Sequence, residues 1–589
     1  MTVTPPPLPR ADGRTPLPHP TGTPAATPAG QAHQAAPGTP PTPPPATAPQ
    51  RAPTAPSSEP TPTDHLTPVS RRFLARAALV TAALSVAGAL LGLVRDQALA
   101  RLFGAGRDTD AFLVAWTLPE FAATLLIEDG LAFALVPAFS VALARRARGG
   151  PGDPVRALLA ATLPRLALAF TATGAALMAG APYLVRALAP GLPDPALAAD
   201  CARLTATCVL SFGLAGYCSA LLRAHRRFTA PAAIYVAYNA GIVTAMPLLG
   251  GRFGVRAAAV GVAAGGCLMV VAQLPSVVRE LRRRSAGEAA GEAGGAQPMA
   301  PALLASVLLF ALCRQSQVLV ERYLGSALPA GAISHLNYAQ KVAQIPMTLS
   351  VMLCTVTFPV VARALADGDT ERARGRVERD VAMATCLVLL GTATVVACAR
   401  PIVELLFQRG AFTARDTAAT AGVMRVYALG LLGQTLVGVL VRAYFSAHRV
   451  TWYPVAAMAA GIAATCWLGA ATVGPWGVRG IAAANACGIT VTAVLLLAGA
   501  GARGVPVRAR SVLRRLPRPL TAAAAATPAG AFAASRPESA VAAAAVGAAT
   551  VAGVFALLCL ALDTQGRAPA LVRSSVRTVT RRFAHGRTR

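Results

Sequence analysis

Apolar runs of helical length follow one another from Phe73 to about residue 562, with short polar breaks between them. A helix needs roughly 20 residues to cross the hydrocarbon core of a bilayer. The runs therefore predict fourteen membrane-spanning helices, over residues 76–100, 109–143, 156–189, 197–222, 229–249, 254–278, 299–324, 330–363, 379–400, 416–441, 452–472, 477–501, 517–534 and 540–562. Several runs exceed the minimum, so we expect tilted or kinked helices. The run over 517–534 is short and alanine-rich.

The charges in the breaks alternate along the chain. One set of loops is rich in arginine, at 145–148, 223–227, 279–284, 372–376, 442–449 and 508–518, with further arginines at 71–72 and 573–582. The loops between them, such as 190–195 and 326–331, are short and nearly uncharged. Basic loops stay on the cytoplasmic side of a membrane. The alternation therefore predicts a multi-pass protein of the cytoplasmic membrane with both termini in the cytoplasm.

The chain divides into five parts by composition. Residues 1–70 hold close to half of the 47 prolines and none of the aromatic residues, which predicts a disordered, proline-rich cytoplasmic tail. Spans one to six form an N-terminal lobe over 71–285, and spans seven to twelve a C-terminal lobe over 286–503. Spans thirteen and fourteen occupy 504–563, and a basic cytoplasmic tail covers 564–589. The predicted fold class is all-α and polytopic.

Composition excludes several functions. Hydrophobic residues make up 54% of the chain and charged residues 13%, about half the share typical of a soluble domain. The net charge of +29 does not indicate nucleic-acid binding, because the basic residues lie in the loops and no basic stripe carries interleaved aromatics. The 11 cysteines lie in or beside apolar runs, so we expect small core side chains and no metal site. No nucleotide-binding or catalytic motif is present, and we expect a transporter without an enzymatic activity.

Ionisable residues inside membrane spans are costly and are functional candidates by default. The first group comprises Arg95 and Asp96 at the end of span one, with Asp110 and Glu128 in span two. Arg95 either faces a central cavity and holds a phosphate, or pairs with Asp96 or Asp110 to lock helices together. Both interpretations stay open.

The second group lies in the C-terminal lobe. Arg314 stands beside glutamines within span seven, and Glu321 and Arg322 lie at its far end, where they either anchor the helix or line a cavity. Lys341, in span eight, is the only lysine in the chain, and it lies too deep for easy snorkelling to the interface. We expect it to line a cavity.

Prolines interrupt one span in each lobe. Pro119 lies in span two and Pro346 in span eight, each after a polar stretch, and both should kink or open their helices. Transporters often place a binding site between two repeats built with interrupted helices. The prolines are therefore candidates for gating.

Five stretches of the chain match a known pattern in order. They are GLVRDQALARLFGAGRDTDAFLVAWTLPEF at 92–121, EDGLAFALVPAFS at 128–140, AGAISHLNYAQKVAQIP at 330–346, PIVELLFQRGAFTARDT at 401–417 and VLVRAYFSAHRVTWYPV at 439–455. With them the chain, over roughly 73–563, resembles the MurJ/MviN family of lipid II flippases, a branch of the multidrug/oligosaccharidyl-lipid/polysaccharide exporters.

The resemblance implies two six-helix lobes around a central cationic cavity, with two extra C-terminal helices. It implies flipping of an undecaprenyl-diphosphate-linked peptidoglycan precursor by alternating access. Arg95 matches a cavity arginine, Asp110 an acidic cavity residue and Glu128 the acid of the family's motif. Lys341 stands where many members have arginine. With Arg314 and Arg322, these are the expected substrate-binding residues, and Asp96 and Glu321 are candidates for helix pairing.

The sequence departs from the family at two positions. An arginine is frequent six residues before Arg95 and another four residues past the span-two proline, and here these positions are Ala89 and Ala123. The cargo is therefore either lipid II or a related lipid-linked glycan. The driving force would be the membrane potential or an ion gradient, without a cofactor. Two rivals stay open, an exporter of another glycan or small molecule, and a scaffold that recruits cell-wall synthesis proteins through the proline-rich tail.

Overall fold

The computed structural model describes residues 71–128, 130–148, 153–282, 301–350, 369–446, 451–501 and 507–562. The predicted tails, and the boundaries predicted at 285/286 and 503/504, lie outside these ranges. Within them the chain folds into helices, and the all-α polytopic fold is confirmed. Eleven helices are long and apolar enough to cross a membrane, or twelve if one bent pair is a single span. Two of the fourteen predicted spans are not among them: 330–363, of which residues 351–363 lie outside the described ranges, and the short 517–534.

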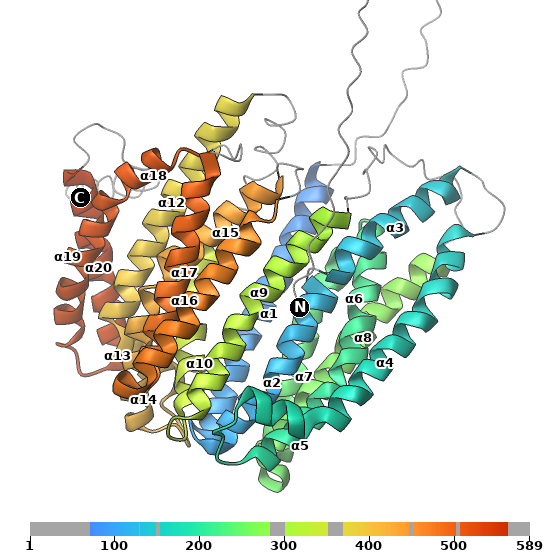
Figure 1. The fold of residues 1–589 in the computed structure, drawn as a ribbon, viewed down its shortest axis with the longest axis horizontal. Helices are drawn as coiled ribbons and strands as arrows, with labels where there is room; N and C mark the ends of the chain where they lie inside the picture. Colours follow the sequence, from blue (N-terminus) through green and yellow to red (C-terminus); the bar gives the residue numbers. More distant parts are fainter. Residues whose placement is uncertain are drawn as a thin grey trace, which may run out of the picture. The chain divides into compact units, whose positions relative to one another are not determined.

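The first predicted lobe contains α1 to α8 (Figure 1). Its helices are α1 (Arg71–Phe103), α2 (Arg107–Ala123), the π-helix η1 (Thr124–Glu128), α3 (Gly130–Ala147), α4 (Pro154–Leu188), α5 (Pro195–Ala206), α6 (Cys208–Ala224), α7 (Thr229–Phe253) and α8 (Arg256–Arg282). The predicted span 109–143 is thus three helical segments, and 197–222 is two.

The second predicted lobe and the C-terminal pair follow in Figure 1. The helices are α9 (Pro301–Ser326), α10 (Ala332–Ala343), α12 (Thr370–Ala397), α13 (Ala399–Phe407), α14 (Ala414–Ala428), α15 (Leu431–Ser446), α16 (Tyr453–Trp476), α17 (Val478–Ala500), α18 (Ala509–Arg515), α19 (Pro517–Ala534) and α20 (Ala540–Ala561). Helices α14 and α15 meet at an angle of 47°. Helix α19 packs against α20 and α12, so it belongs to the helical bundle although its hydropathy is low.

Local capping explains several helix starts. Asp153 accepts hydrogen bonds from the backbone N–H groups of Val155 and Arg156 and is followed by a proline in the first turn of α4. Asp194 caps α5 in the same way, through the N–H of Leu197. These carboxylates satisfy N–H groups that have no partner inside the helix, and the proline fits because its position needs no N–H.

The two lobes share a turn that the sequence did not predict. Gly254 joins α7 to α8 and Gly477 joins α16 to α17, with backbone φ of 56° and 55°. Each glycine N–H closes the preceding helix, on the carbonyls of Gly250 and Val473. Positive φ costs little only at glycine. The turn thus joins the fifth and sixth predicted spans of each lobe, α7 to α8 and α16 to α17. This correspondence supports an internal repeat.

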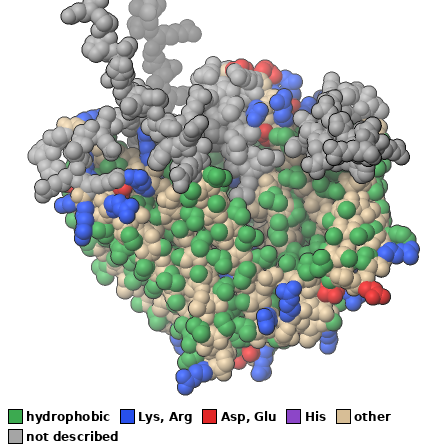
Figure 2. Space-filling view, turned by 180° about the vertical axis from the view of Figure 1, so that it is seen from behind, with side chains coloured by type: hydrophobic (Ala, Val, Ile, Leu, Met, Phe, Trp, Pro, Cys, Tyr) green, Lys and Arg blue, Asp and Glu red, His purple; other side chains and the backbone are tan. Residues whose placement is uncertain are grey.

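An apolar band covers the bundle on the face drawn in Figure 2, and charged side chains gather toward its two ends. One end carries the arginine-rich loops, and we call it the arginine-rich end. The other carries the connections after α1, α4, α9 and α13, which hold fewer arginines, and we call it the arginine-poor end. This distribution is that of a protein whose middle is solvated by lipid.

Candidate functional site

Arg95 of α1 is held inside the first lobe by three kinds of contact. Its Nη2 donates to Asp96 Oδ1 at 2.8 Å and its Nη1 to Asn239 Oδ1, on α7, at 3.1 Å. Its guanidinium lies 4.3 Å from the ring centroid of Trp116 on α2. The side chain is 12% exposed. The ion partner is thus the adjacent Asp96, and it is Asn239, not an acid, that connects Arg95 to a second helix by a hydrogen bond.

Pro119 lies inside α2, which continues past it to Ala123, so the predicted opening of the helix is not seen at the proline itself. Proline has no N–H to donate to the carbonyl of Ala115, and that carbonyl instead accepts from Thr205 Oγ1 at 3.3 Å. Five residues later the helix becomes the π-helix η1, which ends at Glu128. Glu128 accepts a hydrogen bond from the Tyr235 hydroxyl, on α7, at 2.8 Å. Glu128 is exposed and lies on the first lobe, without a basic partner among the contacts described.

Lys341 of α10 reaches across to the first lobe. Its Nζ lies 3.3 Å from Glu120 Oε1, and Glu120 is the residue that follows Pro119. Helix α10 ends at Ala343 and helical structure resumes at Ile345, one residue before Pro346. The ion pair therefore joins the two proline-containing segments of the lobes. Glu120 was not singled out from the sequence, although it is an ionisable residue inside an apolar span, as Glu128 is.

Arg322 and Glu321 are buried in the second lobe, 3% and 1% exposed. Arg322 Nη2 donates to Asn337 Oδ1 on α10 at 3.3 Å, and Glu321 accepts from the Asn485 amide on α17. They hold three helices of this lobe together. Arg322 Nε and Glu321 Oε2 have no hydrogen-bond partner in the described part of the chain. Both residues thus keep unused hydrogen-bonding capacity in the interior.

Arg314 lies apart from this pair. It precedes Arg322 by eight residues on α9, roughly 12 Å along the helix axis. Its side chain is exposed, and no ion pair or hydrogen bond is found for it in the described ranges. Its predicted role in substrate binding stays a prediction.

Asp110 lies at the start of α2, at the arginine-poor end, and is 3% exposed. Its carboxylate accepts hydrogen bonds from the N–H of Gly331, at 2.7 Å, and from the N–H and hydroxyl of Ser334. Gly331 is the N-cap residue of α10. Asp110 of one lobe thus caps a helix of the other, which stabilises both the carboxylate and the N–H groups of the first turn, which have no partner within the helix.

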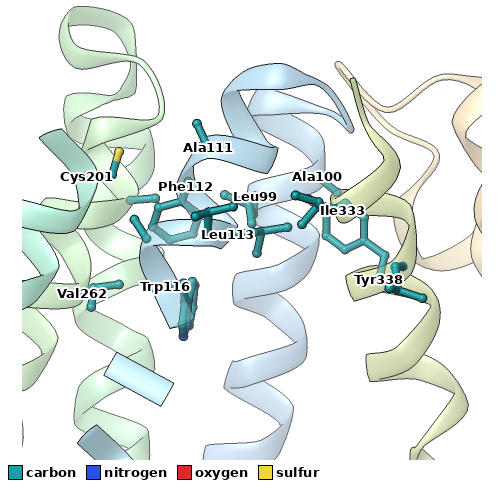
Figure 3. Packing of buried hydrophobic residues seen from close by; sticks show 14 of the residues in the cluster. Leu99, Ala100, Ala111, Phe112, Leu113, Trp116, Cys201, Val262, Ile333 and Tyr338 are labelled. Carbon is teal, nitrogen blue, oxygen red and sulfur yellow. The ribbon is translucent and has the colours of Figure 1, made fainter. Parts of the chain in front are cut away.

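Main-chain contacts join the lobes around this cap. The N–H of Ala411 donates to the Arg101 carbonyl at 2.9 Å. Gly104, with φ of 68°, lets the chains approach, because an added Cβ would lie 2.7 Å from the Ala411 carbonyl oxygen. Figure 3 shows Tyr338 of α10 beside the buried residues of α1 and α2, and the residues form one apolar cluster. The lobes are closed against each other at the arginine-poor end.

A polar cluster inside the second lobe centres on Tyr427, which lies in the last turn of α14, just before the bend to α15. The amides of Gln340, Gln344 and Gln434 lie 3.0, 2.9 and 2.8 Å from its hydroxyl. A hydroxyl has one donor and two acceptor sites, so one glutamine must present its carbonyl oxygen. The cluster ties the break in α10 to the bend between α14 and α15.

A separate pocket of about 610 Å³ opens in the second lobe between α10, α14, α16 and α17. Valines 423, 426 and 478, with Trp476, give it an apolar lining, and His335 and Arg479 are its polar residues. It does not include the charged residues described above. No group of three or more metal-ligating side chains is found in the described residues.

Two membrane-spanning lobes that join through charged residues on proline-containing helices are typical of a multi-pass membrane transporter. The fold is shared with a lipid II flippase MurJ in an inward closed conformation, with a TM-score of 0.65 and 17% identity over 82% of this chain and 98% of that one. It is also shared with an inward-facing multidrug resistance MATE transporter, with a TM-score of 0.56 and 14% identity over 74% of this chain and 99% of that one.

The sequence comparisons specify the family. The model of the family "Lipid II flippase MurJ" matches residues 99–548, and the chain belongs to that family. The lipid II flippase MurJ of Burkholderia cenocepacia is 27% identical over 399 residues, which cover 64% of this chain and 74% of the relative. A probable lipid II flippase MurJ of Rhizobium meliloti is 27% identical over 453 residues, 74% and 82% of the two chains. The resemblance found in the sequence is confirmed.

Proposed function

We propose that the protein flips lipid II, the undecaprenyl-diphosphate-linked peptidoglycan precursor, across the cytoplasmic membrane. Family membership supports the cargo. The observation that carries the mechanism is that basic side chains of both lobes, Arg95 and Lys341, contact the proline-containing helix α2 where the lobes meet. Charge-assisted hydrogen bonds from such groups suit a diphosphate. The polyprenyl tail would stay in lipid while the headgroup crosses between the lobes.

Alternating access supplies the cycle. The closed arginine-poor end faces outward if the arginine-rich loops are cytoplasmic, as the positive-inside rule predicts. Substrate then enters from the cytoplasm, and its release requires the Asp110 cap on α10 to break. Arg322 would add positive charge, and Arg314 and Glu128 are further candidates for contact with the headgroup. The membrane potential or an ion gradient would drive the cycle, and no nucleotide is required.

The test is lipid II accessibility at the outer face of cells depleted of the native flippase and supplied with this chain. We expect the parent chain to restore accessibility, and Arg95→Ala and Lys341→Ala to reach the membrane without restoring it. Normal complementation by both variants would exclude the mechanism. Failure of the parent chain, with correct insertion, would exclude lipid II as cargo.

Ala89 and Ala123 favour a second candidate for the cargo, a lipid-linked glycan related to lipid II. The family pattern has arginine at these two positions, and alanine supplies no charge there, so the site has two cations fewer than the family pattern implies. The same depletion assay distinguishes the candidates, because an exporter of another glycan would leave lipid II inaccessible. Substituting Arg at both positions should then increase lipid II flipping.

A further inference from the structure

The internal repeat places an arginine at the same position in both lobes. Arg256 and Arg479 each follow the positive-φ glycine of the shared turn by two residues, in the first turn of α8 and of α17. In the first lobe, Arg256 donates through Nε and Nη2 to Asp200 Oδ2 on α5, at 3.2 and 2.8 Å. This arginine is therefore neutralised by an acid of its own lobe.

The second lobe has no acid at the corresponding position. Helices α5 and α14 each begin the fourth predicted span of their lobe, and their N-cap residues are Asp194 and Thr413. Six residues after the N-cap stands Asp200 in α5, whereas in α14 the same position is Ala419. No ion pair or hydrogen bond is found for Arg479 in the described ranges. The repeat thus keeps the arginine and loses its carboxylate.

The other acid that could serve is already engaged. Asp416 is the only acidic residue of α14. It accepts hydrogen bonds from the N–H and the hydroxyl of Thr413, at 2.8 and 2.7 Å, and lies 3.7 Å from His335 Nε2. Asp416 completes the cap of α14 and is not among the residues that line the neighbouring pocket. It therefore does not replace the missing partner of Arg479.

Open space takes the place of the missing carboxylate. Ala419 and Arg479 both line the pocket of about 610 Å³ between α10, α14, α16 and α17. The guanidinium lies against α14 at Gly422, where an added Cβ would be 2.7 Å from Arg479 Nη2 and 3.0 Å from its Nε. Because glycine leaves this room, the cation lies at the pocket wall and is exposed to a ligand.

The pocket lining suits an anion with an apolar body. Its volume is in the range of roughly 300–1,000 Å³ that is usual for small-molecule sites. Val423 and Val426 form an apolar wall beside Arg479. Trp476, which is 61% exposed, ends α16 at the arginine-poor end, and tryptophan at the end of a span lies at the membrane–water interface. The pocket is therefore at the depth of phospholipid headgroups.

We propose that this pocket binds an anionic phospholipid from the leaflet at the arginine-poor end. The lipid phosphate would accept charge-assisted hydrogen bonds from Arg479, as Asp200 does from Arg256 in the first lobe, and an acyl chain would lie along the valines. An anionic headgroup is favoured because it carries no ammonium group that competes with the guanidinium. The inference does not depend on the cargo, since the pocket contains none of the charged residues where the lobes meet.

The test measures which lipid lies beside Trp476 in the full-length protein. Trp452 and Trp467, the other exposed tryptophans, are replaced by phenylalanine, and the protein is reconstituted in phosphatidylcholine vesicles. A minor fraction of the lipid carries brominated acyl chains, which quench tryptophan fluorescence on contact, and is either phosphatidylglycerol or phosphatidylcholine. We expect phosphatidylglycerol to be preferred about fivefold at equal mole fraction, the usual effect of one arginine on an anionic lipid.

Three variants separate the pocket from the general basicity of the chain. Arg479→Gln should abolish the preference. Ala419→Asp should abolish it as well while keeping the arginine, because the new carboxylate supplies the partner that Asp200 supplies in the first lobe. Arg256→Gln is the matched control, with the same change of charge at the equivalent position, and should leave the preference unchanged.

Two outcomes overturn the inference. One is equal quenching of the parent protein by the two brominated lipids. The other is a preference for phosphatidylglycerol that survives in Arg479→Gln, and this variant decides alone if Ala419→Asp does not insert.

Discussion

Asp110 caps helix α10 by accepting a hydrogen bond from the N–H of Ser334 in its first turn, although the two residues lie 224 positions apart in the chain. The contact joins the first helical turn of α10, in one lobe, to the start of α2, in the other. A buried carboxylate that accepts three hydrogen bonds and faces a helix N-terminus is well stabilised. It is the polar centre of the closed arginine-poor end.

Asp110→Asn should weaken this closure. The amide keeps the shape but loses the charge and presents an N–H₂ group where an acceptor is needed, which typically costs about 1–3 kcal/mol. Thermal unfolding of the purified protein should show a lower midpoint. Asp108→Asn is the matched control, since Asp108 is 54% exposed and pairs only with Arg107 among the contacts described. Equal midpoints for the two variants would contradict a capping role.

Gly104→Ala should impair transport by separating the lobes. Gly254 is its control, because both glycines end a helix with positive φ, 68° and 56°, but only Gly104 faces another chain segment within 4 Å. Alanine is strained at both positions, by about 1–3 kcal/mol. We expect Gly104→Ala to lose complementation while Gly254→Ala keeps most of it. Similar losses would mean that backbone strain alone is responsible.

Tyr427→Phe should destabilise the second lobe. Removing the hydroxyl leaves the amides of Gln340, Gln344 and Gln434 without a shared partner, at a cost of about 1–3 kcal/mol for a buried unsatisfied group. The measurement is again the unfolding midpoint. Tyr183→Phe, at a side chain that is 72% exposed, should change it little. A neutral Tyr427→Phe would show that the glutamines find other partners.

Arg95→Lys should reduce flipping at least tenfold, roughly 1.4 kcal/mol. Lysine keeps the charge but cannot donate to Asp96 and Asn239 at once or stack on Trp116 in the same geometry. Arg107→Lys, at a side chain that is 70% exposed, is the control. The readout is lipid II accessibility normalised to the amount of protein in the membrane. Full activity of Arg95→Lys would mean that charge alone suffices.

Hydrophobic runs and loop charges were enough to predict the fold, because both reflect the solvent around each segment. The same information located Pro119, Pro346 and Lys341. It did not locate the partner of Lys341, since Glu120 is 221 positions away and only the packed lobes bring the two together. The breaks at Thr207 and at the α14–α15 bend carry no proline, so the apolar pattern ran through them.

The closure at the arginine-poor end is made largely of main chain: Gly104 against the Ala411 carbonyl, the Ala411 N–H on Arg101, and Gly331 under Asp110. Rotation of a single side chain cannot undo these main-chain contacts. The closure can open only when whole helices separate, so passage is all-or-none. A bilayer holding this protein should accordingly leak few small ions between turnovers, even though the cargo is far larger than they are.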